Sequence, residues 1–233
     1  MHLRSLPSLA FLALSIPTIA FTQPKPTEHR NTKPADRDRQ LQALEYQQKG
    51  YQNFFAAKID KSLDDFDAFL AVFPERKPHH WQRGISLYYA GRFAEGKEQF
   101  ELHQTVNPQD VENAVWHFIC SAKTPEFGIE HAREHFISIT QDPRIPMKQI
   151  HALFAGNGTP EEVLDAANHA PLSRRPNALC YAHLYLGLYY EALDEPEKSL
   201  HHIKKAALEF TQSHYMGEVA RVHLHLRTAK NAR

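Results

Sequence analysis

Residues 83–108 read RGISLYYAGRFAEGKEQFELHQTVNP, and they repeat the layout of residues 49–74, KGYQNFFAAKIDKSLDDFDAFLAVFP. Four pairs of corresponding residues lie 34 positions apart: Gly50 and Gly84, Ser62 and Gly96, Phe66 and Phe100, Pro74 and Pro108. A later segment, LGLYYEALDEPEKSLHHIKKAALEF, keeps the same steps of 12 and 4 residues at Gly187, Ser199 and Ile203. Self-similarity at a period of this length is typical of proteins built from stacked repeats.

Each repeated position has an expected physical role. The Gly lets the first helix of a pair approach the second closely, and the small residue twelve positions later receives that helix from the other side. The large apolar residue four positions beyond is expected to fill the space between pairs, and the Pro ends the second helix. Apolar residues at three- and four-residue steps, such as Leu63, Phe66 and Leu70, indicate helices from Asp36 onward. The pattern predicts an all-α protein.

The pattern resembles the tetratricopeptide repeat, and this resemblance implies a right-handed solenoid of helix pairs. Two details depart from the family: Trp81 lies one position later than the usual Trp, and Thr211 stands in place of the final Pro of the third copy. The implied domain covers 36–233, with copies at about 43–76, 77–110 and 180–213, a degenerate section at 111–176, and a helix at 214–229 that caps the open end.

The degenerate section still carries helix signals. VENAVWHFICSA and PEFGIEHAREHFISI are expected to form an atypical third pair, and PMKQIHALF a short helix after it. Thr159 followed by Pro160 and Glu162 predicts a helix start closed by a capping box.

The N-terminus has the features of an export signal. Arg4 precedes an apolar run that is short for a membrane span, and Thr18-Ile19-Ala20 supplies small residues at a cleavage spacing. Residues 1–20 are therefore expected to be a signal peptide, with an uncleaved anchor as the alternative, and the Pro-rich residues 21–35 a disordered linker. No Cys follows the apolar run, so no lipid anchor is expected. These features predict a periplasmic or secreted protein.

The charge balance and the cysteine content each give one further expectation. Lys+Arg and Asp+Glu are balanced at 27 each, so bulk charge favours neither a nucleic-acid nor an anionic-membrane partner. The two cysteines, Cys120 and Cys180, could pair after export, or remain free because each lies in an apolar helical run.

The inner face of the expected solenoid is the candidate binding groove. In such repeats the fifth, ninth and twelfth positions of each first helix point into the groove. The matching positions are Gln47, Tyr51 and Phe54 in the first copy and Trp81, Ile85 and Tyr88 in the second, and the next helix adds Glu112, Asn113, Trp116 and His117. An aromatic groove with a few amides and carboxylates suits an extended peptide, although part of this aromatic set is expected to pack between helices.

A second resemblance concerns function. VENAVWHF, LYLGLYYEALDEPEKSLHHIKKA and EVARVHL are similar to segments of exported envelope lipoproteins of the NlpI type, which act as adaptors for envelope enzymes. The chain lacks their lipid-attachment Cys, so membrane tethering is not implied. The resemblance implies an adaptor that binds a protein or peptide, with self-association into a homodimer as another hypothesis.

An alternative from a different class rests on the 16 histidines. His131, Glu134 and His135 fit H-x-x-E-H, in which two histidines on one helical face hold zinc and the Glu acts as base. No third ligand follows in a matching context. No nucleophile elbow, phosphate-binding Gly loop or Cys-x-x-Cys is present, so no enzyme activity and no cofactor are expected.

One residue of the repeated stretch is not explained by packing. His103 stands where the family places Ala and where the first copy has Phe69. It is expected to face the next helix, near Asn113, Trp116 and His117, and to make a structural hydrogen bond.

Overall fold

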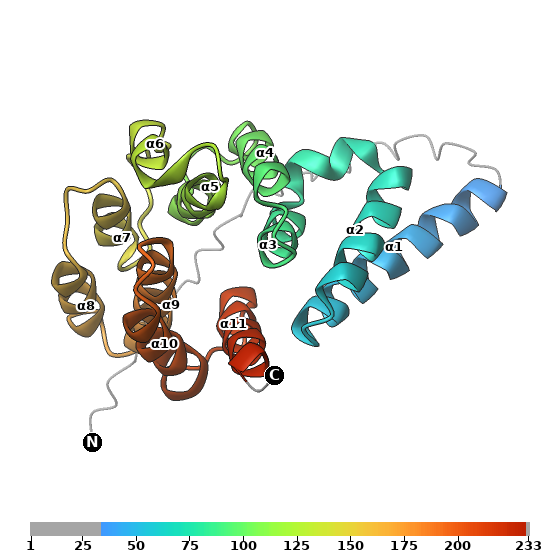
Figure 1. Cartoon of the computed structure of the whole chain (residues 1–233). Helices are drawn as coiled ribbons and strands as arrows, with labels where there is room; N and C mark the ends of the chain where they lie inside the picture. Colours follow the sequence, from blue (N-terminus) through green and yellow to red (C-terminus); the bar gives the residue numbers. More distant parts are fainter. Residues whose placement is uncertain (1–33, 232–233) are drawn as a thin grey trace, which may run out of the picture. The chain divides into compact units, whose positions relative to one another are not determined.

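The computed structural model describes residues 34–231, and secondary structure in this part of the chain is helical, with no strand (Figure 1). The expected signal peptide and all but the last two residues of the expected linker lie outside these residues. Those two residues, Pro34 and Ala35, begin the first helix instead, because Pro is well suited to the first turn of a helix. Among the described helices, none has both the length and the apolar character needed to cross a membrane.

The first two helix pairs follow the expected breaks. α1 (Pro34–Phe55) packs against α2 (Ile59–Val72), and α3 (Trp81–Tyr89) packs against α4 (Phe93–Gln104). The 3-10 helix η1 (Pro74–His79) joins the pairs, and its Pro74 follows Phe73, the C-cap of α2. Gly91 adopts a φ of 73° in the turn between α3 and α4, a conformation that favours glycine.

Close contact within each pair depends on glycine, as predicted. A Cβ atom on Gly84 would lie 2.7 Å from the ring of Phe100, and one on Gly187 would lie 2.5 Å from Ile203. Gly50 faces the ring of Phe66 in the same way. In all three copies the glycine therefore packs against the large residue 16 positions later. The large residue also faces the following helix, in line with the expectation that it fills the space between pairs: the ring of Phe66 lies 4.5 Å from that of His80, and the ring of Phe100 lies 6.3 Å from that of Trp116.

The small residues make the contacts from one pair to the next helix. Ser62 of α2 and Ser86 of α3 have their hydroxyl oxygens 3.1 Å apart. A Cβ atom on Gly96 of α4 would lie 2.9 Å from the sulfur of Cys120, in α5 (Val111–Lys123). Both contacts join residues 24 positions apart, and Ser86 and Cys120 are themselves 34 apart. The repeated spacing thus continues into α5, the first helix of the degenerate section.

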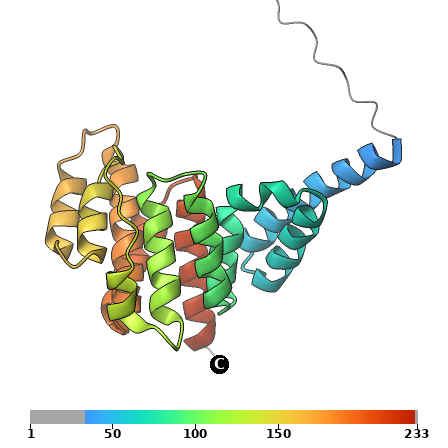
Figure 2. The same ribbon diagram turned by 90° about the horizontal axis from the view of Figure 1, so that it is seen from above.

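The degenerate section has shorter helices. α5 packs against α6 (Gly128–Glu134) and α7 (Met147–Phe154), and α7 packs against α8 (Pro160–Asn168). α7 and α8 lie side by side in both Figure 1 and Figure 2. The predicted capping box is confirmed: Thr159 Oγ1 accepts from the backbone of Glu162, and Glu162 Oε2 accepts from the backbone of Thr159. The helix expected over PEFGIEHAREHFISI is only seven residues long.

The C-terminal part consists of α9 (Arg175–Ala192), α10 (Pro196–Lys204), the π-helix η2 (Lys205–Glu209) and α11 (Tyr215–Asn231). α11 corresponds to the helix expected to cap the open end. It contacts α9, α10 and η2, and it also contacts α1 at the start of the described chain. The ring of Tyr215 stacks on Phe54 at 5.5 Å and meets Trp81 edge to face at 4.8 Å. α11 therefore covers part of the expected groove.

A half-buried carboxylate ties α11 to two other helices. Glu191 of α9 accepts a hydrogen bond from the hydroxyl of Tyr88 at 2.8 Å and lies 2.8 Å from Nε2 of His223. Nδ1 of His223 is in turn 3.0 Å from the hydroxyl of Tyr89. Burial alone would raise the pKa of Glu191, but His223, Tyr88 and the charge of Lys123 outweigh it and hold the pKa at about 2.

The cysteines do not pair. Cys120 and Cys180 are both free and buried. Burial raises the pKa of Cys180 to about 11, so its thiol stays protonated at neutral pH.

Candidate functional site

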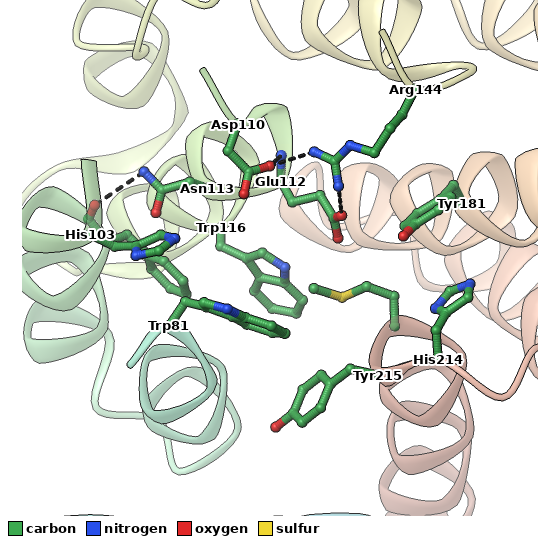
Figure 3. A pocket seen from close by; sticks show the side chains of 12 residues that line it. Trp81, His103, Asp110, Glu112, Asn113, Trp116, Arg144, Tyr181, His214 and Tyr215 are labelled. Atoms are coloured by element: carbon green, nitrogen blue, oxygen red, sulfur yellow. Dashed lines mark hydrogen bonds and ion pairs between the residues drawn. The ribbon is translucent and has the colours of Figure 1, made fainter. Parts of the chain in front are cut away.

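A cavity of about 220 Å³ lies where α3, α4, α5, α9 and the start of α11 meet (Figure 3). It is lined by Trp81, Phe100, His103, Asp110, Glu112, Asn113, Trp116, Arg144, Tyr181, His214, Tyr215 and Met216. This volume is below the roughly 300–1,000 Å³ usual for sites of drug-sized ligands, so the cavity suits a small group or a single side chain.

Aromatic rings form much of the wall. Trp116 is 1% exposed and stacks on Phe100 at a ring distance of 6.3 Å, which fixes its position in α5. Figure 3 shows Trp81, Trp116, Tyr181 and Tyr215 around the same space, with the side chain of Glu112 beside them. Trp81 is placed by its edge-to-face contact with Tyr215. Rings brought together from α3, α4, α5, α9 and α11 give a rigid apolar surface.

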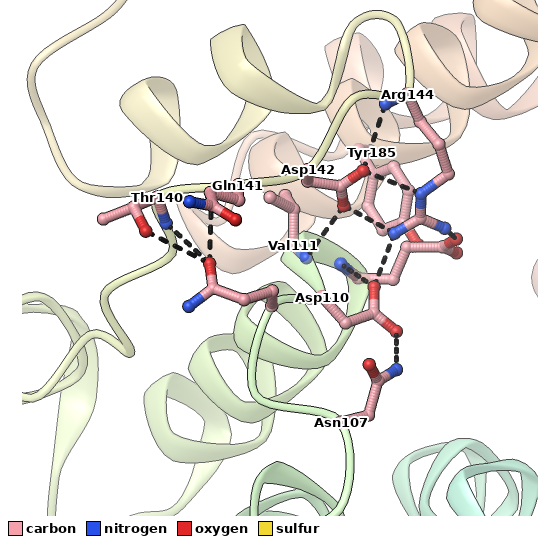
Figure 4. A network of polar contacts seen from close by, with 10 residues as sticks. Asn107, Asp110, Val111, Thr140, Gln141, Asp142, Arg144 and Tyr185 are labelled. Atoms are coloured by element: carbon pink, nitrogen blue, oxygen red, sulfur yellow. Dashed lines mark hydrogen bonds and ion pairs between the residues drawn. The ribbon is translucent and has the colours of Figure 1, made fainter.

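One side of the cavity is a network of charged groups around Arg144 (Figure 4). Its guanidinium donates to Asp110 at 2.6 Å, to Asp142 at 2.9 and 2.6 Å, and to Glu112. The other oxygen of Glu112 accepts from the hydroxyl of Tyr185 at 2.6 Å. Three carboxylates thus surround one guanidinium, which leaves an excess of negative charge when all are ionised.

Local hydrogen bonds bring Arg144 to the start of α5. Asp110 caps α5 by accepting from the backbone of Glu112, and Asp142 accepts from the backbone of Val111. Further along the same segment, the side-chain oxygen of Gln109 accepts from the backbone of residues 140 and 141. The bonds to Asp110 and Asp142 satisfy amide groups that the first turn of α5 leaves free. The segment before α7 is thereby held across the N-terminus of α5.

The pKa of the Glu112 carboxyl lies well above that of an exposed glutamate. Burial raises the pKa of its carboxyl to about 7, against the opposing effects of the Arg144 charge and of the Tyr185 hydrogen bond. The carboxyl of Glu112 is therefore harder to ionise than that of an exposed glutamate.

Tyr185→Phe is expected to raise the pKa of Glu112 above its value of about 7, because the lost hydrogen bond favours the charged carboxylate. A carboxyl ¹³C NMR titration of Glu112 measures the shift. Tyr189→Phe serves as the control, since its hydroxyl makes no contact with Glu112. An unchanged or lower pKa in Tyr185→Phe would contradict this role of the hydroxyl.

Several polar atoms on the cavity-lining side chains have no hydrogen-bond partner within the described residues. Two belong to side chains at least nine-tenths buried: the indole N–H of Trp116 and the amide oxygen of Asn113. The other two are Nε2 of His214 and the hydroxyl of Tyr215. Because an unpaired buried polar group costs roughly 1–3 kcal/mol, these four atoms need partners, which bound water or a ligand in the cavity would supply.

The structure divides the nine candidate groove residues into separate environments. Trp81, Glu112, Asn113 and Trp116 line the cavity. The other five do not line it. Phe54 packs on Tyr215, Tyr51 packs on Phe66, and the hydroxyl of Tyr88 donates a hydrogen bond to Glu191. His117 lies in a shallow depression described below, and Gln47 is half-buried on α1. Six are buried, namely Phe54, Tyr88, Glu112, Asn113, Trp116 and His117. The aromatic positions therefore do not form one open groove.

Sequence reasoning did not identify the second half of the cavity. Arg144 lies in a segment without helical periodicity, and Tyr181, His214, Tyr215 and Met216 reach the site because α9 packs on α5 and α11 packs on α9. The available signal was Glu112, a carboxylate at a position that helical periodicity places on an inner face. A buried carboxylate needs a cationic or hydrogen-bonding partner.

His103 lines the same cavity as Asn113 and Trp116, in line with the expected neighbours, whereas His117 does not line it. The side chain of His103, however, makes its hydrogen bond with none of these three residues. Nδ1 of His103 donates to the backbone carbonyl of Pro78, at 2.8 Å. The bond ties α4 to the 3-10 helix between the first two pairs.

The histidines of the H-x-x-E-H pattern lie elsewhere. His131, Glu134 and His135 line a shallow depression together with His117, and the rings of His131 and His135 stack at 4.1 Å. His135 follows the last residue of α6, and its Nδ1 donates to the backbone carbonyl of His131 at 2.9 Å. Within residues 34–231, no three His, Cys, Asp or Glu side chains are placed to hold one metal ion.

No protein-family model matches the chain. The likeness to tetratricopeptide repeats therefore depends on the repeated residues and their contacts.

Proposed function

We propose that the protein is an exported adaptor of the tetratricopeptide-repeat type, in which stacked helix pairs form a right-handed solenoid and a protein partner is held at the aromatic cavity. The observation that carries the binding role is the unpaired indole N–H of Trp116 beside the unpaired oxygen of Asn113. A peptide offers the complementary carbonyl and N–H groups in every residue.

The repeated contacts support the proposed fold. The glycine contacts at a spacing of 16 residues recur in three copies, and the small-residue contacts at a spacing of 24 occur between successive helix pairs. Such nearest-neighbour contacts are those that stack repeats. Because Tyr215 of α11 packs on Phe54 and Trp81, the proposed partner contact is confined to the cavity rather than spread along a groove.

The partner and location are tested by capture in native cells. A tagged full-length protein is expected to fractionate with exported proteins and to retain a protein partner after mild crosslinking. Trp81→Ala is expected to lose this partner, because it removes one wall of the cavity. Leu172→Ala is the control, since Leu172 is 78% exposed and does not line the cavity.

Both variants are first compared with the wild type by thermal unfolding, so that a loss of partner is not a loss of fold. Equal capture by the wild type and Trp81→Ala would contradict binding at the cavity. A protein found only in the cytosolic fraction would contradict export.

A further inference from the structure

We propose that the cavity holds a basic side chain, lysine or arginine, of the partner's peptide. This inference rests on the proposed adaptor function and specifies the chemistry that the site recognises. It is carried by the charge of the cavity, its aromatic rings and its unpaired polar atoms.

The charge of the cavity favours a cation. Of the cavity-lining residues, Arg144 is the one Lys or Arg, and four of its N–H bonds go to Asp110, Glu112 and Asp142. The guanidinium is thus committed to carboxylates and is not free to bind an anionic ligand. An incoming cation would instead be attracted by the surplus negative charge of these three groups.

The aromatic walls favour the same kind of ligand. Trp81, Trp116, Tyr181 and Tyr215 present ring surfaces around the space, and Met216 adds a polarisable sulfur. A cation within about 6 Å of such rings gains roughly 0.5–2 kcal/mol, most in a desolvated site. The aliphatic part of a lysine or arginine side chain would also pack on these rings.

The unpaired atoms favour a side chain that belongs to a peptide. The amide oxygen of Asn113 can accept from an N–H group, whereas the indole N–H of Trp116 needs an acceptor. A bare metal ion or a simple amine offers no acceptor. A basic residue within a peptide offers both, since its backbone carbonyl accompanies the cationic side chain.

The two tryptophans provide a direct readout. The chain has 2 Trp residues, Trp81 and Trp116, and both line the cavity. Their two indole ¹H–¹⁵N resonances therefore report on this site alone. The probes are acetyl-Gly-X-Gly-amide peptides in which X is lysine, arginine, norleucine or glutamate, added to the full chain at constant ionic strength. Norleucine keeps the apolar chain of lysine and removes its charge. n-Butylammonium tests whether a free amine suffices.

The lysine and arginine peptides are expected to shift the Trp116 resonance saturably, with a dissociation constant on the order of 1 mM for a single anchored residue. The norleucine and glutamate peptides are expected to bind at least about tenfold more weakly. Binding of norleucine or glutamate as tight as that of lysine would overturn the proposal, as would no shift with any peptide. Binding of n-butylammonium as tight as that of the lysine peptide would overturn its peptide part.

Variants locate the interaction. Glu112→Gln is expected to weaken binding of the lysine peptide about tenfold at pH 8 and to leave the weak norleucine binding unchanged. Glu130→Gln is the control, because Glu130 is an exposed carboxylate outside the cavity. Tyr181→Leu, at a half-buried position, removes a ring without removing a charge and is expected to weaken lysine binding threefold to tenfold. Undiminished lysine binding in Glu112→Gln and Tyr181→Leu would overturn the assignment to this cavity.

The peptide titration tests the basic anchor, and the capture experiment tests the adaptor function. A captured partner together with no preference for basic peptides would overturn the basic anchor alone. Selective binding of lysine peptides with no captured partner would instead overturn the adaptor function.

Discussion

Replacing Glu191 by glutamine is expected to lower the free energy of unfolding by about 2 kcal/mol at pH 7, an order-of-magnitude value reduced for partial solvent exposure. The carboxylate accepts from Tyr88 of α3 and contacts His223 of α11, so its charge holds three helices together. Glutamine keeps the shape of the side chain and removes this charge. Chemical denaturation of both proteins measures the difference.

The same substitution has a defined pH dependence. The pKa of Glu191 is depressed to about 2 in the folded protein, against about 4.3 for an unperturbed Glu. Its contribution to stability is therefore fully present above pH of about 4.3 and is lost as the pH falls toward 2. The difference between wild type and Glu191→Gln is expected to shrink over this range.

Glu130→Gln is the control for this experiment, because the Glu130 side chain is 85% exposed and pairs only with Arg133, at 3.4 Å. It is expected to change stability by less than about 0.5 kcal/mol. A Glu191→Gln effect as small as this control would contradict the role assigned to the carboxylate.

Replacing Gly84 by alanine is expected to lower the free energy of unfolding by about 1–2 kcal/mol. In an ordinary helix interior this change stabilises by up to ~1 kcal/mol, so the predicted sign is opposite to that of helix propensity. The reason is that the new methyl group would lie 2.7 Å from the ring of Phe100, which is 1% exposed and stacks on Trp116.

A double-mutant cycle isolates this contact. Phe100→Leu shortens the side chain that faces Gly84, so the loss in Gly84→Ala/Phe100→Leu is expected to be smaller than the sum of the single losses by at least ~0.5 kcal/mol. Gly50 and Gly187 face Phe66 and Ile203 in the same way, so Gly50→Ala and Gly187→Ala are also expected to lower the free energy of unfolding. Stabilisation by alanine at any of the three positions would contradict the repeated packing.

The helices could be predicted from sequence because their signals are local: the helix break at Pro74 and the cap at Thr159 each depend on residues close in the chain. Gly84 could be predicted because it recurs 34 residues after Gly50. The spacing shows which residues recur but not which neighbour each one meets. For this reason the double contacts, of Phe100 with Gly84 and Trp116 and of Gly96 with α3 and Cys120, could not be predicted in full.

The cavity could be predicted only in part. Trp81, Glu112, Asn113 and Trp116 were expected on an inner face from the repeat resemblance, and all four line the cavity. Whether that face is open depends on α11, which packs on α1 and α9. The sequence pattern of α11 does not indicate which helices it packs against.

Arg144 was beyond sequence reasoning for a similar reason. It reaches Glu112 across 32 residues, from a segment with no periodic signal.

Site-specific photocrosslinking tests the central claim, that the cavity holds a protein partner, most directly. A p-benzoylphenylalanine at Tyr181, on the half-buried wall of the cavity, is compared in native cells with one at the exposed Leu172. The account predicts one dominant protein adduct from position 181, absent from position 172, with the crosslink mapped by mass spectrometry next to a lysine or arginine of the partner. No protein adduct from position 181, or the same adducts from both positions, would contradict it.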